Sequence, residues 1–208
     1  MIAAIASFLG LPHRGRHERA GFLLYGAAVA AARDPYLYAR IGVPDTLDGR
    51  FDLVGLHAFL LIRRLRHAPE PGPVLAQAVF DAMFADMDIN LRELGVGDMT
   101  IGKRVRAMWE AFHGRAAAYE AAMFAPNGSA PNGSTPDGAV PDGAANLAEA
   151  NLAEALARNV WRGFSPPEGA ARALARLACA QDAHLAHQGM ASLAKGEVGF
   201  LSAEAAAR

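Results

Sequence analysis

The chain has 208 residues, 20 Lys and Arg against 21 Asp and Glu, a formal net charge of −1 and 52% hydrophobic residues. This length suits one domain with a sizeable core. The balanced charge argues against a DNA-binding protein, because no excess of cations is present to neutralise phosphates. The single cysteine, Cys179, excludes an internal disulfide framework and a zinc site built on cysteine pairs.

The N-terminal segment 1–16 is apolar as far as Leu11 and then basic, with Arg14 and Arg16. This order is typical of an amphipathic segment that lies on an anionic membrane surface. It is also typical of a terminal helix that docks on the core, and the sequence leaves both interpretations open. No apolar run reaches the roughly 20 residues that a membrane-spanning helix needs.

Residues 17–124 predict a helical core. Its first helix is predicted over 17–33 and ends there because the residue before a proline avoids helical geometry. Asp34 is then expected to cap a short helical turn that begins at Pro35.

Three longer helices are predicted after a loop over 41–50. They span 51–67, 73–94 and 99–124. The helix 51–67 is apolar nearly all round, which is typical of a central bundle helix. Gly95 is expected to follow the end of the second helix, and Asp98 to cap the third.

Residues 125–144 are four tandem pentapeptides that contain Pro-Asn-Gly or Pro-Asp-Gly. This turn chemistry without an apolar face predicts a flexible linker. Residues 145–208 are expected to form C-terminal helices that pack on the core, over 146–161 and then to about Ala194 after a capping box at 165–168. The predicted fold class is all-α, a single bundle of about six to eight helices with the flexible linker before the last two.

The sequence contains no constellation that indicates catalysis. It has one Glu-x-x-His pair, Glu110 and His113, whereas a carboxylate-bridged di-metal bundle needs two. It has no Gly-x-Ser-x-Gly elbow and no Gly-rich phosphate loop. We therefore predict a binding protein and not an enzyme, with no metal or cofactor. Two alternatives stay open: a helical haem- or quinone-binding protein that uses His57 or Glu110 and His113, and a membrane-peripheral scaffold.

Several blocks of sequence follow one another in an order typical of one family. One of them is Gly-Val-Pro-Asp-Thr at 42–46, and together the blocks cover 25–38, 42–52, 57–65, 84–88, 92–103 and 112–119. In this succession the chain resembles the ubiquinol–cytochrome c chaperone family, the assembly factors of the cytochrome bc complex (complex III). The resemblance implies an all-α, non-enzymatic protein that binds newly made cytochrome b and assists maturation of the complex.

The same resemblance implies partners and a location. The partners are cytochrome b or another subunit of the bc complex, and a small assembly protein like the one that works with mitochondrial family members. The location is cytoplasmic and peripheral to the inner membrane, with contact to the membrane surface.

A chaperone of this kind needs apolar side chains to cover its client and polar residues at the rim to release it. The candidate partner-binding residues are Tyr36, Tyr38, Asp45, Arg50, His57, Arg63, Arg64, Met83, Met87, Lys103, Arg104 and Met108. The aromatic and methionine side chains have core packing as their alternative role. Asp45 and Arg50 have structural support of the loop as theirs, and His57 has simple burial.

Overall fold

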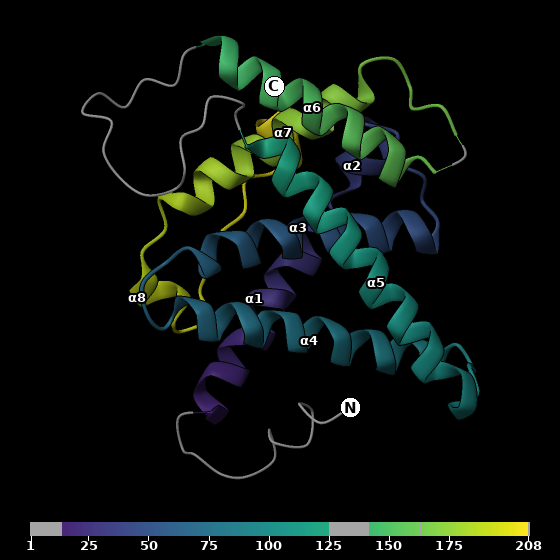
Figure 1. Cartoon of the computed structure of the whole chain (residues 1–208), viewed down its shortest axis with the longest axis vertical. Helices are drawn as coiled ribbons and strands as arrows, with labels where there is room; N and C mark the ends of the chain where they lie inside the picture. The colour runs from purple at the N-terminus through teal and green to yellow at the C-terminus, as the bar shows by residue number, and fades with distance from the viewer. Residues whose placement is uncertain (1–13, 125–141, 163, 208) are drawn as a thin grey trace.

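Helices account for the regular structure of the computed structural model, which describes residues 14–124, 142–162 and 164–207 (Figure 1). The helices are α1 (Arg14–Ala32), α2 (Pro35–Ala39), α3 (Leu47–Arg66), α4 (Gly72–Glu93), α5 (Asp98–Met123), α6 (Asp142–Val160), α7 (Ala170–Ala186), α8 (Met190–Leu193) and α9 (Ala203–Ala207). No β-strand occurs in these ranges, which confirms the all-α prediction. Most of the predicted amphipathic segment and of the predicted linker, 1–13 and 125–141, lies outside the described residues.

The centre of the bundle is α3, which contacts α1, α4, α5, α6 and α7 (Figure 1). Its leucines at 53, 56, 60, 61 and 65 are all at most 1% exposed. Burying a leucine side chain fully stabilises a protein by about 1.5–3 kcal/mol relative to leaving it in water. The prediction that this apolar helix is central is therefore confirmed.

The helices on either side of residues 125–141 share one hydrophobic core. Phe112 and Tyr119 of α5 belong to it, and so do Leu152 and Leu156 of α6 and Leu174 of α7. In Figure 1, α5 runs diagonally across the molecule from the end of α4 to α6. One face of α5 is thereby covered by α3, α4 and α6, as its apolar spacing predicts.

Helix ends follow local chemistry where the sequence carries a clear signal. The Asp34 carboxylate accepts a hydrogen bond of 2.9 Å from the Tyr36 amide, as predicted. At the end of α4, Gly95 has a φ of +77° and its amide donates to the Arg92 carbonyl. The Val96 amide donates to the Leu91 carbonyl, which completes a Schellman motif that a residue with a Cβ adopts poorly.

Four predicted helix boundaries or caps differ from the structure. Helix α3 begins at Leu47 inside the predicted loop, because the Thr46 hydroxyl accepts a hydrogen bond from the Gly49 amide and caps the helix early. The capping box at 165–168 is wrong: the N-cap of α7 is Gly169, with a φ of +73° and no side-chain hydrogen bond. The last long helix ends at Ala186, where a turn leads to the short α8. At the start of α5, Gly97 occupies the N-cap position expected for Asp98.

Candidate functional site: an apolar groove with a charged end

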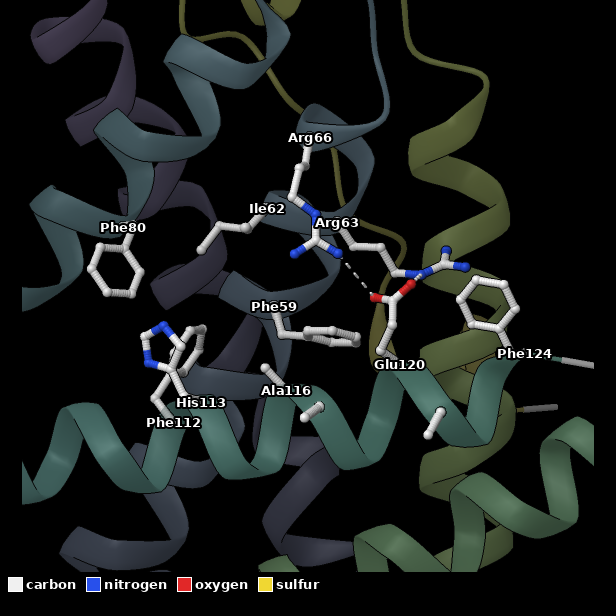
Figure 2. A pocket seen from close by; sticks show the side chains of 12 residues that line it. Phe59, Ile62, Arg63, Arg66, Phe80, Phe112, His113, Ala116, Glu120 and Phe124 are labelled. Atoms are coloured by element: carbon white, nitrogen blue, oxygen red, sulfur yellow. Dashed lines mark hydrogen bonds and ion pairs between the residues drawn. The ribbon is translucent and has the colours of Figure 1, made fainter. Parts of the chain in front are cut away.

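A groove with a volume of about 550 Å³ lies between α3, α4 and α5 (Figure 2). Binding clefts for small ligands have volumes of about 300–1,000 Å³. The residues that line the groove are Phe59, Ile62, Arg63, Arg66, Phe80, Phe112, His113, Ala116, Ala117, Glu120, Ala121 and Phe124. Most of this surface is apolar, and the charged residues gather towards Phe124 (Figure 2).

The floor of the groove follows from helical spacing. On α3, Phe59 and Ile62 are three residues apart, and on α5, Phe112 and Ala116 are four apart, so each pair lies on one helix face. Phe80 of α4 closes one side, with its ring centroid 6.0 Å from that of Phe112. Phe59 and Phe112 are each 5% exposed and also belong to the core, which gives the groove a rigid base.

Small side chains on α5 keep the groove open. Ala117 and Ala121 line it and are exposed, and Phe124 at the end of the helix is 44% exposed. An alanine projects little beyond the helix backbone, so a bound segment could approach α5 closely along this face.

The charged end of the groove is built around Glu120, whose carboxylate is shared by two arginines (Figure 2). Arg63 donates to Glu120 Oε1 at 3.3 Å and, with Nη1, to both carboxylate oxygens of Asp182 on α7 at 2.7 Å. Arg66 Nη2 is 3.7 Å from Glu120 Oε2, too far for a hydrogen bond. The side chain of Arg63 is 23% exposed and that of Arg66 is 58% exposed. Arg63 is therefore fixed by the fold, whereas Arg66 reaches into solvent.

Arg64, between these two, turns away from the groove. Its guanidinium donates to the carbonyl oxygens of Leu185 and Gln188, both at 2.9 Å. The Leu185 carbonyl lies in the last turn of α7, where helical hydrogen bonding runs out, and the Gln188 carbonyl lies in the turn that follows the helix. Arg64 thus caps α7 and holds the turn to α8.

The edge of the groove opposite the charged end carries His113 and Trp109. The two rings are 3.9 Å apart between centroids, and Nδ1 of His113 is 2.9 Å from the Trp109 carbonyl oxygen. Trp109 is 44% exposed, which is unusual for a large aromatic side chain. Together they extend the apolar surface beyond the groove along α5.

A second ionic cluster lies inside the bundle. Asp52 of α3 is 1% exposed, and its carboxylate contacts Arg162 Nη2 at 2.7 Å and Arg115 Nη1 at 3.4 Å. Burial raises the pKa of Asp52 above its usual range, although both arginines act to lower it. Arg115 also lies over the Phe51 ring at 5.0 Å. This cluster ties α3 to α5 and to the segment after α6.

Of the twelve predicted partner-binding residues, the groove contains Arg63. Three of the others are closed off from solvent: His57, Met83 and Met87 are at most 5% exposed. Nδ1 of His57 is 2.8 Å from the Leu53 carbonyl oxygen, and its ring lies edge-on to Phe200. Burial lowers the pKa of His57, and its hydrogen bond to Leu53 opposes that shift. Buried in this way, His57 has no surface to offer a partner or a haem iron.

The remaining predicted residues lie elsewhere. Tyr36, Tyr38 and Met108 are half-buried against the core, and the Tyr38 hydroxyl donates to the Ala32 carbonyl oxygen at 2.9 Å. Lys103 and Arg104 are exposed on α5.

Asp45 and Arg50 form an exposed ion pair of 2.6 Å that spans the start of α3. The hydrogen bond from Arg50 lowers the pKa of Asp45. This contact matches the structural role that the sequence left open for the pair.

The residues that sequence reasoning missed are chiefly Arg66, Ile62, Phe80 and the alanines of α5. Arg66 belongs to the Arg-Arg-x-Arg cluster at 63–66. The sequence therefore shows its charge but does not predict that its side chain lines the groove. The alanines carry no chemical signal of their own. They become part of a site only because three helices diverge around them.

Neither a metal site nor a membrane span is found where the structure describes the chain. Residues 14–124, 142–162 and 164–207 contain no group of three or more His, Cys, Asp or Glu side chains placed to hold a metal ion. Within the same ranges, no helix has the length and hydropathy needed to cross a bilayer. Burial raises the pKa of Cys179 to about 11, so its thiol stays protonated at neutral pH.

Fold and groove together define an all-α bundle that presents an open apolar surface between three of its helices. Residues 39–130, which contain the whole of the groove lining, match the family described as ubiquinol-cytochrome C chaperone. Over these residues the chain is similar to this family, which agrees with the resemblance inferred from the sequence motifs.

Two relatives extend the comparison. The crystal structure of the Cbp3 homolog from Brucella abortus has a TM-score of 0.72 and 29% sequence identity, and the match covers 91% of this chain and 93% of that chain. The ubiquinol-cytochrome-c reductase complex assembly factor 1 of Xenopus laevis is 20% identical over 106 residues. That match covers 51% of this chain and 53% of the Xenopus protein, so the chain spans about half the length of this curated relative.

Proposed function

We propose that the protein is an assembly factor of ubiquinol–cytochrome c reductase that binds newly made cytochrome b and assists its maturation. The family description and the name of the Xenopus relative support the role in assembly. The observation that carries the proposal is the apolar groove, because it lies entirely inside the segment that matches the family. The protein acts by binding, without catalysis, in the cytoplasm at the surface of the inner membrane.

The groove fits a client that exposes apolar helical surface before assembly. Apolar helices are recognised by laying one face into a hydrophobic groove. The aromatic floor supplies the apolar contact, since each large side chain that leaves water contributes about 25 cal/mol per Å² of buried area. The charged side chains of Arg63, Arg66 and Glu120 at one end of the groove keep the protein soluble when no client is bound.

The test is complementation of cells that lack the gene, read out by reduced-minus-oxidised b- and c-type haem spectra and by quinol–cytochrome c reductase activity. We expect selective loss of the bc-complex signal in the deletion strain and full restoration by the wild-type gene. An Ala117→Trp variant fills the groove from an exposed position and should restore little of the signal.

Ala111→Trp is the matched control, because Ala111 is exposed on the same helix but does not line the groove. It should restore the signal fully. A deletion strain with an unchanged spectrum and activity would refute the proposed function. Equal complementation by both tryptophan variants would refute the groove as the site while leaving the function in place.

A further inference from the structure

Three arginines lie in the last turn of α3, and the fold leaves one of them available to a ligand. Arg63 is held by Asp182 and Glu120, and Arg64 by the carbonyls of Leu185 and Gln188. Among the described residues, Arg66 has a single ionic contact, the 3.7 Å approach to Glu120 Oε2, and no hydrogen bond. Its guanidinium therefore presents unused donors at the charged end of the groove.

Arg63 is shared by two neighbouring carboxylates. Asp182 receives two 2.7 Å contacts from Arg63, and Glu120 Oε1 receives a third contact from the same guanidinium. These three side chains leave one negative charge, which Arg66 offsets with its donors unused. Glu120 Oε2 is buried and has no hydrogen-bond partner, so Arg66 covers it without neutralising it through a close contact. An incoming carboxylate would find its donors on Arg66, whose fork geometry suits bidentate recognition.

The length of the groove sets the length of the bound segment. On α5 the lining runs from Phe112 to Phe124, a distance of about 18 Å at 1.5 Å per residue. This corresponds to about three turns of a helix laid alongside α5. Most of the apolar lining precedes Glu120 along α5, with Ala121 and Phe124 after it. Arg66 approaches Glu120 from α3 (Figure 2).

From this arrangement we infer that the groove selects an apolar helical segment of about three turns that carries an acidic side chain at the Arg66 end. The inference rests on the proposed function and names the kind of client segment that the groove binds. Charge complementarity at Arg66 distinguishes such a segment from an apolar helix that ends in a neutral or a basic residue.

The experiment measures binding of fluorescent helical peptides of about twelve residues with one leucine face and a terminal Glu, Gln or Lys. At low salt, the wild-type protein should bind the Glu peptide about two- to fivefold more tightly than the Gln peptide, as is usual for an ion pair at a partly exposed site. The Lys peptide should bind most weakly. Arg66→Gln should abolish the preference for the Glu peptide, and Arg66→Glu should reverse the order of the three peptides.

The matched control is Arg176→Gln, because Arg176 is an exposed arginine on α7 that does not line the groove. It should keep the wild-type preference for Glu. Equal binding of the Glu and Lys peptides to the wild-type protein would overturn the inference. The inference would also be overturned if anionic lipid vesicles bound in an Arg66-dependent way while the peptides showed no preference. The anion that Arg66 binds would then be a lipid headgroup.

The peptide series separates this inference from the proposed function. Binding of the Gln peptide reports the apolar groove alone, so tight binding without a charge preference would overturn the acidic-residue assignment and nothing else. The role in assembly fails separately, on the haem spectrum of the deletion strain.

Discussion

The molecule contains two ionic clusters of the same design in which a carboxylate is shared by two arginines, and they differ in their access to water. Asp52 lies between Arg115 and Arg162 at 1% exposure, whereas Glu120 lies between Arg63 and Arg66 at 19%. The carboxylate of the first cluster is buried, and the second cluster forms one end of a groove. The same arrangement of a carboxylate and two arginines therefore fixes the bundle in one place, and in the other it leaves Arg66 exposed at a groove.

The difference in access sets the energetic cost of losing each carboxylate. A buried charge that loses its partner stays out of water and uncompensated. A charge at the rim of a groove regains water when its partner is removed, so the loss is small. Three measurements of stability test this difference between the two clusters.

The largest effect is expected from Asp52→Ala, which leaves Arg115 buried at 7% exposure with its closest ionic partner gone. We expect the free energy of unfolding to fall by about 3–5 kcal/mol, measured by urea denaturation. Asp45→Ala is the control, because Asp45 pairs with Arg50 in an exposed position, and it should leave the unfolding midpoint unchanged. A loss of stability no greater for Asp52 than for Asp45 would contradict the assignment of the buried cluster.

A smaller effect is expected from Arg63→Met, which leaves Asp182 and Glu120 partly buried without their shared partner. We expect a loss of about 1–2 kcal/mol, between the values for exposed and fully buried pairs. Arg66→Met should lose less than about 0.5 kcal/mol, because its one contact is long and exposed. If the two variants were equally destabilised in thermal or urea unfolding, Arg66 would be a structural residue and its availability to a ligand would be in error.

The third measurement compares a buried histidine with an exposed one across pH. Because burial lowers the pKa of His57, the unfolded chain takes up a proton near the ordinary histidine value of 6.5 while the folded protein does not. The unfolded state then binds more protons, so stability falls as the pH drops below about 6.5, by at most about 1.4 kcal/mol per pH unit. The loss ends once the pH passes below the folded-state pKa.

His57→Asn keeps a donor near the Leu53 carbonyl and removes the titrating group, so it should flatten this part of the stability profile. His67→Asn, at an exposed position, should leave the slope as it is in the wild-type protein. The readout is the free energy of unfolding from urea curves between pH 7.5 and 5. A slope that survives in the His57 variant would assign the titration to another group.

The sequence predicted helix ends correctly where a particular residue type meets a particular need of the backbone. Asp34 caps α2 and Gly95 ends α4 as predicted, since a carboxylate meets a free amide and glycine tolerates a positive φ. The predicted capping box at 165–168 failed because its residues stand before Gly169, which forms the N-cap of α7 through backbone conformation alone. A sequence that matches the capping-box motif does not cap α7, because that helix begins after the motif ends.

The sequence was less informative about surfaces than about helices. Met83 and Met87 have the adaptable side chains of a binding surface, yet both pack in the core. Ala117 and Ala121 have no distinguishing chemistry, yet they line the groove. A methionine stripe and an alanine stripe have the same helical period, and only the neighbouring helices decide which of them is covered.

The sequence was sufficient to predict the all-α class, the central position of α3 and the resemblance to the chaperone family, because each depends on patterns that local periodicity and ordered motifs express. Only the tertiary structure shows which arginine of the last turn of α3 keeps its hydrogen-bond donors available to a ligand. Arg63 meets an aspartate 119 residues away in the chain, and Arg64 meets carbonyls at similar separation. These contacts form only when helices far apart in the sequence pack together. The local sequence of the last turn of α3 therefore does not predict that Arg66 lies exposed beside the groove.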